Sequence, residues 1–300
     1  MTNGKGSKKM YGLLGKNINY SLSPFMHNAA FKRFDIPAEY RLFDIKEKDL
    51  DAFFQELISG GDIKGINVTV PYKIKVKEML DACQACSVND EVKILGAVNT
   101  VKAEKSGLIG YNTDGEGFYE ALMEVSSHVF NPLGKDVFVL GAGGAGRTIC
   151  LYLAFLGRNK PNSISVFDVD KRKLSELKAS FDAWPKSVAF YPVESADHIP
   201  DRIEKCNLVV NATPLGTKEG DPLPVDPDLL DPNAAVCDLV YARDTELCQE
   251  ARTRGNVAIN GMKMLVNQAA LAFRIWTREP IEEIKNVMEG AVKKTLKGLK

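Results

Sequence analysis

Two polar side chains in the first part of the chain could form a proton-transfer couple. Lys73 follows an apolar run that ends at Pro71, at a point where a helix is expected to begin. A partly buried lysine can have a lowered pKa and can then both give and accept a proton. Asp114 precedes a second expected helix, and its carboxylate could pair with Lys73 and orient it. A solvated helix lysine and a helix N-cap are the alternatives for these two residues.

Two segments carry pairs of polar residues at a spacing of two. Ser21 and Ser23 precede an expected helix, and their hydroxyls could bind a carboxylate or a hydroxyl, although Ser23 could instead cap the helix. Asn67 and Thr69 should point to one face of a strand over residues 66–70, because side chains alternate along a strand. Both pairs are candidates for ligand binding.

Two further segments place an amide side chain beside small or apolar residues. Asn99 offers a donor and an acceptor within the run Gly96 to Thr100. Gln268 shares a helix face with Met264, four residues before it. An amphipathic helix with Gln268 at its edge is the alternative for the second segment.

A glycine-rich turn in the middle of the chain could bind a dinucleotide. It follows the apolar run 137–140, and Gly141, Gly143 and Gly146 fit the pattern G-x-G-x-x-G. The first glycine allows a tight turn, the second lets the backbone approach a pyrophosphate, and the third lets the helix pack on the strand. The helix N-terminus then offers free N–H groups to phosphates. Asp168 closes the next apolar run, where an acidic residue can bind the ribose. A glycine-rich connection in an ordinary α/β domain is the alternative.

The arrangement of elements around these segments indicates two domains. From Val137 onward strands and helices alternate, which predicts a parallel sheet with helices on both faces. The candidate strands are 137–140, 164–167, 188–191, 208–211, 236–240 and 257–259. We therefore expect an α/β fold with an N-terminal α/β substrate domain of residues 1–115, completed by helices in 262–300. Residues 116–261 should form a Rossmann-type doubly wound parallel sheet that binds NAD(P).

Composition excludes several other classes of function. The chain has 300 residues with 39 Lys+Arg and 39 Asp+Glu, so no net charge attracts nucleic acid or an anionic membrane. The sequence contains no run of 18 apolar residues, so we expect no membrane span. The first nine residues include charged residues but no apolar stretch, so we expect a flexible lead-in and no signal peptide. We therefore expect a cytoplasmic protein.

The six cysteines are scattered, and in a cytosolic chain we expect them to be reduced. Cys83 and Cys86 form one C-x-x-C, which two cysteines one helical turn apart produce easily. A zinc site would need a second such pair or histidines at ligand spacing, so we expect no metal.

Taken together, the motifs resemble those of the shikimate dehydrogenase family over nearly the whole chain. In order they read S-L-S-P, N-V-T-V-P-Y-K, G-A-V-N-T, G-Y-N-T-D-G, G-A-G-G-A-G, N-A-T-P-L-G, D-L-V-Y and G-x-x-M-L-x-x-Q-A-A. Eight motifs in one order are far more specific than any one of them. The resemblance implies reversible hydride transfer between NAD(P) and the ring carbon that bears one hydroxyl of shikimate, in aromatic amino acid biosynthesis.

The resemblance also implies roles for individual residues. Lys73 would exchange a proton with the reacting hydroxyl, Asp114 would be its partner, and Ser21 and Ser23 would bind the substrate carboxylate. The shell around the ring hydroxyls would consist of Asn67, Thr69, Asn99, Asp114 and Gln268, with Tyr241 as a further substrate contact. The cofactor would lie along Gly141, Ala142, Gly143, Gly144, Ala145, Asp168, Arg172, Thr213, Leu239, Gly261 and Met264.

One departure from the family pattern concerns the choice of cofactor. The biosynthetic family commonly has Asn-Arg-Thr after this strand, and its arginine meets the 2′-phosphate of NADP. Here Asp168 replaces that arginine, and an acid favours a free 2′-hydroxyl. NAD is therefore favoured, as in the quinate/shikimate dehydrogenase branch. Arg172 aligns with a second basic position of the family's NADP pattern. Binding of NADP, the family's usual cofactor, therefore stays an alternative.

Two other functions agree less well with these motifs. A non-catalytic shikimate- or quinate-sensing regulator on the same fold should lack Lys73, Asp114 or the glycine turn, and the sequence keeps all three. A two-domain dehydrogenase that acts on folates would not explain the Ser-x-Ser and Asn-Thr-Asp segments. Serine at both positions of the first motif favours shikimate over quinate. The expected partner is this small molecule, and the chain would be a monomer or a homodimer.

Overall fold

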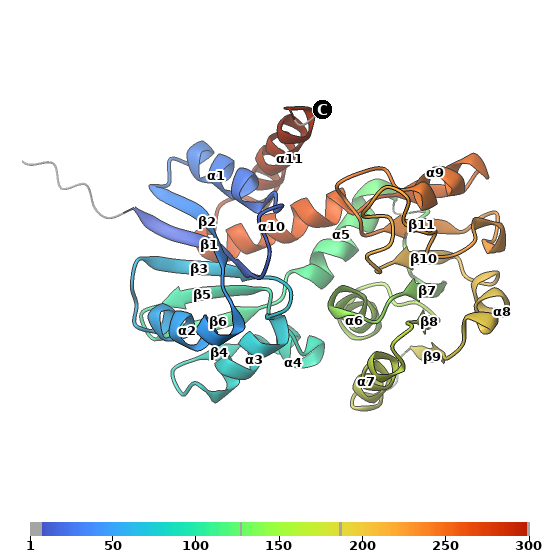
Figure 1. Cartoon of the computed structure of the whole chain (residues 1–300), viewed down its shortest axis with the longest axis horizontal. Coiled ribbons are helices and arrows are strands. Elements are labelled where there is room, and N and C mark those ends of the chain that lie inside the picture. The colour runs from blue at the N-terminus through green and yellow to red at the C-terminus, as the bar shows by residue number, and fades with distance from the viewer. Residues whose placement is uncertain (1–7, 127, 186–187, 299–300) are drawn as a thin grey trace, which may run out of the picture. The chain divides into compact units, whose positions relative to one another are not determined.

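The chain divides into two compact units, Met1–Thr113 with Val266–Lys300 and Asp114–Leu265. The computed structural model describes residues 8–126, 128–185 and 188–298 (Figure 1). The expected lead-in falls mostly on residues 1–7, outside the described residues. None of the described helices is long and apolar enough to cross a membrane.

The first unit is built on a six-stranded mixed sheet with the strand order β2-β1-β3-β5-β6-β4. Its strands are β1 (Lys9–Gly15), β2 (Ala38–Asp44), β3 (Ile63–Val68), β4 (Ser87–Val88), β5 (Thr100–Glu104) and β6 (Gly107–Tyr111). Strand β1 pairs in parallel with β2 and β3, whereas β5 runs antiparallel to β3 and β6.

Helices cover both faces of this sheet. They are α1 (Ser23–Arg33), α2 (Leu50–Ile58), α3 (Lys73–Ala82), α4 (Asp90–Leu95), α10 (Met262–Thr277) and α11 (Ile281–Gly298), with the short turn η1 (Glu47–Asp49). Leu14 of β1 shares one core with Phe54 of α2, Val76 of α3 and Val92 of α4. The opposite face carries an aromatic core with α1 and α10.

The aromatic core is closely packed around Tyr11 and Trp276. The ring centroid of Tyr11 lies 5.0 Å from those of Phe31 and of Trp276. The indole N–H of Trp276 donates to the Val101 carbonyl at 3.0 Å, so its polar atom is satisfied. Glycine is needed at Gly65 of β3, because a Cβ there would lie 2.5 Å from the indole nitrogen.

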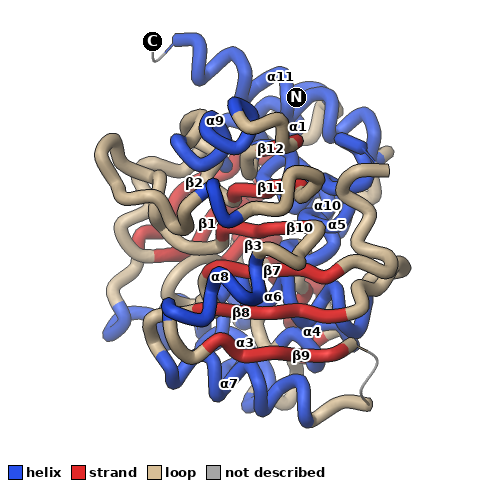
Figure 2. The backbone as a smooth tube through the Cα atoms, turned by 90° about the vertical axis from the view of Figure 1, so that its right-hand side faces the viewer, coloured by secondary structure: helices blue, strands red, loops and turns tan. Residues whose placement is uncertain are grey.

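The second unit is a six-stranded, all-parallel sheet in the order β12-β11-β10-β7-β8-β9 (Figure 2). The strands are β7 (Asp136–Leu140), β8 (Ser163–Phe167), β9 (Ala189–Val193), β10 (Leu208–Asn211), β11 (Ala235–Asp238) and β12 (Val257–Ile259). Counted from β7, this is the strand order 3-2-1-4-5-6 of the dinucleotide-binding doubly wound sheet. The predicted fold class is confirmed.

Successive side chains of β7 point to opposite faces of this sheet. The helical segments are α5 (Asp114–Ser126), α6 (Gly144–Leu151), η2 (Tyr152–Leu156), α7 (Lys171–Asp182), η3 (Ala196–His198), α8 (Ile199–Ile203), η4 (Pro227–Leu229) and α9 (Glu246–Thr253). Phe138 and Leu140 belong to the core with Ile203 of α8 and Leu247 of α9. The other face packs against α6.

Four of the six predicted strands have different bounds in the structure, and the strands predicted over 137–140 and 164–167 each begin one residue earlier. The strand predicted over 188–191 is β9 at Ala189–Val193, and the strand predicted over 236–240 ends at Asp238. The second strand ends early because the Asp238 carboxylate accepts the Val240 N–H at 3.0 Å, which turns the chain away from the sheet.

The expectation that all six cysteines are reduced is wrong for one pair. Cys83 and Cys86 form a disulfide, whereas Cys150, Cys206 and Cys237 are free and buried, as is Cys248. Helix α3 ends at Ala82, so the pair lies in the turn beyond it rather than on a helix. The Cys86 N–H donates to the Cys83 carbonyl at 3.0 Å, and this turn brings the two Cα atoms to 5.2 Å.

His27 should make the stability of the protein fall in acid. Its side chain is fully buried, neither ring nitrogen has a hydrogen-bond partner among the described residues, and its ring stacks on Tyr40 at 4.2 Å. Burial lowers the pKa of His27 from 6.5 to about 3. The unfolded chain therefore binds the proton first, and stability is lost as pH falls below 6.5, by up to about 1.4 kcal/mol per pH unit until about pH 3.

The measurement is the free energy of unfolding in urea at several pH values from 7 to 4. His27→Phe keeps an aromatic ring in the core and should flatten this acid dependence. His198→Gln, on the exposed η3, is the control and should leave the dependence unchanged. Parallel curves for the wild-type protein and His27→Phe would show that His27 does not cause the loss.

Candidate active site

Polar side chains of the first unit form a pair of serines and, separately, a chain of hydrogen bonds that begins at Tyr40. The Ser21 Oγ lies 3.1 Å from the Ser23 Oγ. The Tyr40 hydroxyl donates to the Asn67 Oδ1 at 2.8 Å. The Asn67 Nδ2 in turn donates to the Thr100 Oγ1 at 3.0 Å. Most of these groups are buried, and the bonds that begin at Tyr40 connect β2 with β3 and β5.

The chain continues to the last residues of the first unit. The Thr100 hydroxyl donates to the Asn99 Oδ1 at 2.9 Å, and the Asn99 Nδ2 donates to the Thr113 Oγ1 at 2.9 Å. The Thr113 hydroxyl lies 3.0 Å from the Gln268 carbonyl, to which it donates. The predicted residues Asn67, Asn99 and Gln268 therefore belong to one chain of hydrogen bonds, whereas Ser21 and Ser23 form a separate pair. Sequence analysis missed Tyr40, Thr100 and Thr113, although the last two stand inside quoted motifs.

The start of α1 differs from the helix cap that was one alternative for Ser23. Helix α1 begins at Ser23 itself, so Ser23 is not the N-cap. The Ser21 Oγ accepts the backbone N–H of Ser23 at 3.2 Å. Ser21 thus supports the helix start, and both hydroxyls lie together at the N-terminus of α1.

Lys73 begins α3 and lies next to the Asn99 segment. Its backbone carbonyl accepts the N–H of Val98 at 3.0 Å, and its side chain is half-buried. The strand predicted over 66–70 ends at Val68, so Thr69 stands one residue beyond β3, and its place on the face of Asn67 stays a prediction. The chain turns at that point, because the Tyr72 N–H donates to the Thr69 carbonyl at 2.9 Å.

Asp114 is the first residue of α5 and of the second unit, and it is only 7% exposed. It directly follows Thr113, whose N–H donates to the Asn99 Oδ1 at 2.8 Å. Lys73 and Asp114 belong to different units, and their pairing stays a prediction.

The glycine turn of the second unit has the geometry that a pyrophosphate site needs. Gly141 has a φ of +97°, which favours glycine, and a Cβ on Gly146 would lie 2.0 Å from the Gly141 carbonyl oxygen. At Gly143 and Gly144 a Cβ would meet nothing within 4 Å. Helix α6 begins at Gly144. Open space in front of these backbone groups at a helix start fits a phosphate group.

Asp168 lies beside this turn, at the end of β8. Its Oδ2 accepts the N–H of Ala142 and its Oδ1 accepts the N–H of Asp170, both at 2.8 Å. The Lys173 Nζ stands 4.0 Å from its Oδ1, and the Asp168 side chain is 9% exposed. The carboxylate is therefore fixed against the glycine turn, where a ribose would lie.

Arg172 is paired with a neighbour on the surface. Its Nε and NH2 groups contact the two carboxylate oxygens of Asp170 at 3.2 and 3.0 Å, and its side chain is 87% exposed. Hydrogen bonding to Asp170 raises the pKa of Arg172 and lowers that of the Asp170 carboxyl. Asp170 partly neutralises the charge of the Arg172 guanidinium, which is the group expected to bind the 2′-phosphate of NADP.

The other predicted cofactor residues gather where β10 and β11 end. The N–H and hydroxyl of Thr213 donate to the Asn211 Oδ1 at 3.0 and 2.6 Å, and the Leu239 N–H donates to the Asn211 carbonyl at 2.9 Å. A Cβ on Gly261 would lie 2.1 Å from the Leu239 carbonyl oxygen, so this approach requires glycine. Tyr241 follows in the half-buried loop after β11.

Met264 is half-buried in the first turn of α10. The Leu265 N–H donates to the Gly261 carbonyl at 2.9 Å, so this turn is tied to the Leu239 loop through Gly261.

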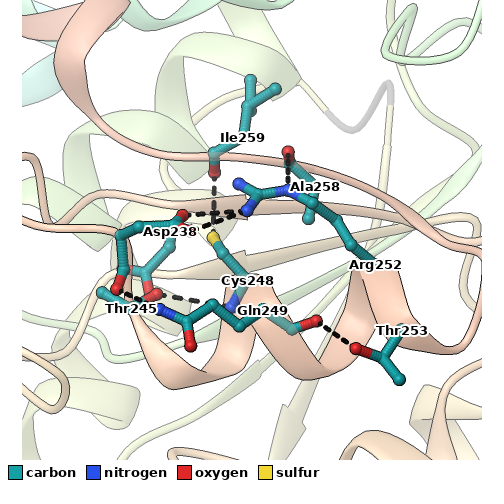
Figure 3. A network of polar contacts seen from close by, with 9 residues as sticks. Asp238, Thr245, Cys248, Gln249, Arg252, Thr253, Ala258 and Ile259 are labelled. Atoms are coloured by element: carbon teal, nitrogen blue, oxygen red, sulfur yellow. Dashed lines mark hydrogen bonds and ion pairs between the residues drawn. The ribbon is translucent and has the colours of Figure 1, made fainter.

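Asp238 holds these loops together and was missed by sequence analysis. It is fully buried at the end of β11 and accepts hydrogen bonds from the Asn211 Nδ2 at 3.0 Å and the Thr245 hydroxyl at 2.7 Å. Figure 3 shows it beside Thr245 and Cys248 at the start of α9. Burial raises the pKa of Asp238, and the hydrogen bonds oppose this. Asp238 is the first residue of the quoted motif D-L-V-Y and closes an apolar strand, and these were its signals in the sequence.

The fold and the two sites define a class of protein, the two-domain α/β proteins with a Rossmann-type nucleotide-binding unit. Residues 13–101 match the family described as shikimate dehydrogenase substrate binding domain, and residues 261–292 match the shikimate 5′-dehydrogenase C-terminal domain. The chain belongs to the shikimate dehydrogenase family.

Relatives agree over almost the full length of the chain. It is 36% identical to the shikimate dehydrogenase (NADP+) of Bacillus subtilis, over 94% of this chain and 97% of that protein. The structure of shikimate 5-dehydrogenase from Listeria monocytogenes in complex with shikimate and NAD has a TM-score of 0.83 and 29% identity, covering 96% and 99% of the two chains. Quinate dehydrogenase from Corynebacterium glutamicum in complex with NAD has a TM-score of 0.80 and 29% identity, covering 93% and 98%.

Removal of the Asp238 carboxylate should destabilise the second unit. Asp238→Ala leaves the donors of Asn211, Val240 and Thr245 without this acceptor, and we expect a loss of about 3 kcal/mol in the free energy of unfolding. Asp238→Asn can accept from Asn211 and Val240 and donate to the Thr245 oxygen, so it should lose less than about 1 kcal/mol. Urea unfolding followed by circular dichroism measures both. Equal losses would show that the charge of Asp238, rather than its hydrogen bonds, stabilises the loops.

Proposed function

We propose that the chain is a shikimate dehydrogenase, which catalyses the reversible NAD(P)-dependent reduction of 3-dehydroshikimate to shikimate. The observation that carries this proposal is the polar site of the first unit, in which Asn67 and Asn99 lie on one chain of hydrogen bonds and the Ser21 and Ser23 hydroxyls form a pair at the start of α1. Membership of the family and the Bacillus subtilis relative support it. Each of these groups can pair with a substrate oxygen, so an analogue without that oxygen would leave a buried group unpaired.

The residues of this chain divide the chemistry among them. Ser21 and Ser23 bind the substrate carboxylate at the N-terminus of α1, where N–H groups also favour an anion. Bound NAD(P)H supplies the hydride that reduces the ring carbonyl. Lys73 gives a proton to the carbonyl oxygen as it becomes a hydroxyl, and takes it back in the reverse direction. Asp114 orients the lysine and binds a ring hydroxyl.

NAD is the preferred cofactor in this proposal. The Asp168 carboxylate is fixed beside the glycine turn, where it can accept a hydrogen bond from a ribose 2′-hydroxyl and would repel a 2′-phosphate. Arg172, the residue that could offset this repulsion, is paired with Asp170. The Listeria and Corynebacterium relatives, whose structures contain NAD, support this preference, whereas the Bacillus subtilis relative is named for NADP.

Quinate oxidation with NAD is a second candidate activity. The Corynebacterium relative and the acid at Asp168 favour it. Steady-state kinetics with shikimate and quinate, each with NAD and NADP, test the substrate and the cofactor together. Activity with neither substrate would contradict the proposal and favour a sensor. The cytoplasmic location and the monomeric or dimeric state stay predictions.

Replacement of Lys73 should abolish most of the turnover while the substrate still binds. Lys73→Ala removes the proton donor, so kcat should fall by about 10²–10⁴ with a small change in the Kd of shikimate. Stopped-flow absorbance of NADH measures turnover, and isothermal titration measures binding. Lys75→Ala, on the exposed surface of the same helix, is the control. Near wild-type turnover in Lys73→Ala would contradict its role.

Replacement of Asp168 should change the cofactor preference. Asp168→Ala removes the charge that repels a 2′-phosphate, so the ratio of kcat/KM for NADP to that for NAD should rise about tenfold or more. Asp168→Asn keeps an acceptor for the Ala142 N–H and separates loss of charge from loss of support for the turn. An unchanged ratio in both variants would exclude Asp168 as the selecting residue.

A further inference from the structure

Cys83 and Cys86 form their disulfide in a turn that the rest of the first unit holds in place. The Cys83 N–H donates to the Leu80 carbonyl at 3.2 Å, which keeps the turn on the last residues of α3. A Cβ on Gly107, at the start of β6, would overlap the Ala85 carbonyl oxygen, so the turn packs directly on this glycine. Backbone contacts around the two cysteines therefore fix their positions.

The chain is fixed again directly after the second cysteine. Ser87 and Val88 form β4, which pairs with Ile109 and Gly110 of β6. The Asn89 N–H then donates to the Gly110 carbonyl at 3.0 Å. Because the turn is held on both sides, the two cysteines should stay close when the bond between them is broken, with their Cα atoms near the present 5.2 Å. The disulfide can then form again without a search of the chain for its partner.

A reagent in solution can reach this disulfide. Both cysteines are half-buried, and the two residues between them, Gln84 and Ala85, are exposed. The cysteines pack against the edge of the core that contains Leu80, but they are not fully buried members of it. Access from solvent is what a thiol needs in order to attack a disulfide sulfur.

The other four cysteines offer no comparable site. Cys150, Cys206, Cys237 and Cys248 are free and buried, and all four belong to the second unit. Burial raises the pKa of Cys206 to about 12 and that of Cys248 to about 11, so few of these thiols ionise at neutral pH. Thiol chemistry on the folded protein should therefore be confined to the pair in the first unit.

We propose that Cys83 and Cys86 form a dithiol–disulfide exchange site, which reacts reversibly with a dithiol while the protein stays folded. A thiolate of the dithiol attacks one sulfur of the pair, the bond between the cysteines breaks, and the other cysteine leaves as a thiolate and takes up a proton. The second thiol of the reagent then attacks the mixed disulfide and releases the first cysteine. Two electrons and two protons thus pass to the protein, and the reagent becomes a disulfide. The oxidised reagent re-forms the protein disulfide by the reverse steps.

The exchange can be followed on the full chain with dithiothreitol at several ratios of its reduced to its oxidised form. The pair follows the C-terminus of α3, where the helix dipole disfavours a thiolate, so a strong dithiol reductant is needed. Free thiols are then blocked with N-ethylmaleimide and located by peptide mass spectrometry. The peptide that contains Cys83 and Cys86 should change from no label to two labels as the ratio rises, while the four buried cysteines stay unlabelled.

Urea distinguishes an exchange site from a disulfide that only stabilises the fold. A site that reacts in the folded protein should be reduced at a rate that changes less than about twofold at urea concentrations below the unfolding transition. Reduction only when the protein unfolds would overturn the inference. A pair that stays reduced at every ratio of the reagent would overturn it as well.

Cys86→Ser tests whether the two cysteines act as a pair. With oxidised glutathione, the remaining Cys83 should form a mixed disulfide that no neighbouring thiol resolves, so this adduct should reach about ten times the level in the reduced wild-type protein. Cys206→Ser is the matched control, because a hydroxyl can replace the thiol that donates to the Arg202 carbonyl at 3.2 Å. It should leave the labelling and the adduct level unchanged. These measurements follow thiols rather than turnover, so their outcome is independent of the proposed function. Equal adduct levels in Cys86→Ser and the wild-type protein would overturn the inference.

Discussion

The hydrogen bonds of Asn99 are the constraint on which the first unit depends. Its backbone N–H donates to the Tyr111 carbonyl, and its own carbonyl accepts the N–H of Val68 at 2.7 Å. Its side-chain oxygen accepts from the N–H of Thr113 and from the hydroxyl of Thr100. One buried residue therefore ties β3 to β6 and fixes the last residue before the chain enters the second unit.

In the second unit, the buried Asp238 has the role that Asn99 has in the first unit. A buried carboxylate without a cation is costly unless donors surround it, and here three donors from β10, the loop after β11 and the start of α9 do so. Both units thus use a buried polar group at strand ends to fix loops that carry ligand-binding residues. Fully satisfied networks of this kind make a site rigid, and a rigid site loses less entropy when a ligand binds.

Much of this arrangement could be predicted from short segments of the sequence. The glycine turn and the strand–helix alternation rest on local backbone preferences, and all six strands of the second unit were found. Helix α4 was missed because six residues are too few for a periodic pattern, although Asn89 caps it and Gly96 ends it with a φ of +72°. The disulfide was missed because the C-x-x-C was explained by the spacing of one helical turn, whereas α3 ends at Ala82, before both cysteines.

The sequence by itself determined the family, the parallel sheet and most of the residues that can meet a substrate or a cofactor, because these follow from motifs and local periodicity. Only the tertiary structure decided which buried groups support them. Tyr40 stands 27 positions before Asn67, and the two meet because β2 and β3 pair on either side of β1, where Tyr11 aligns with Tyr40 and Leu13 with Asn67. Asp238 likewise meets Asn211 through the register of β10 and β11. Strand register is set by the packing of whole sheets, so no short segment of the sequence contains it.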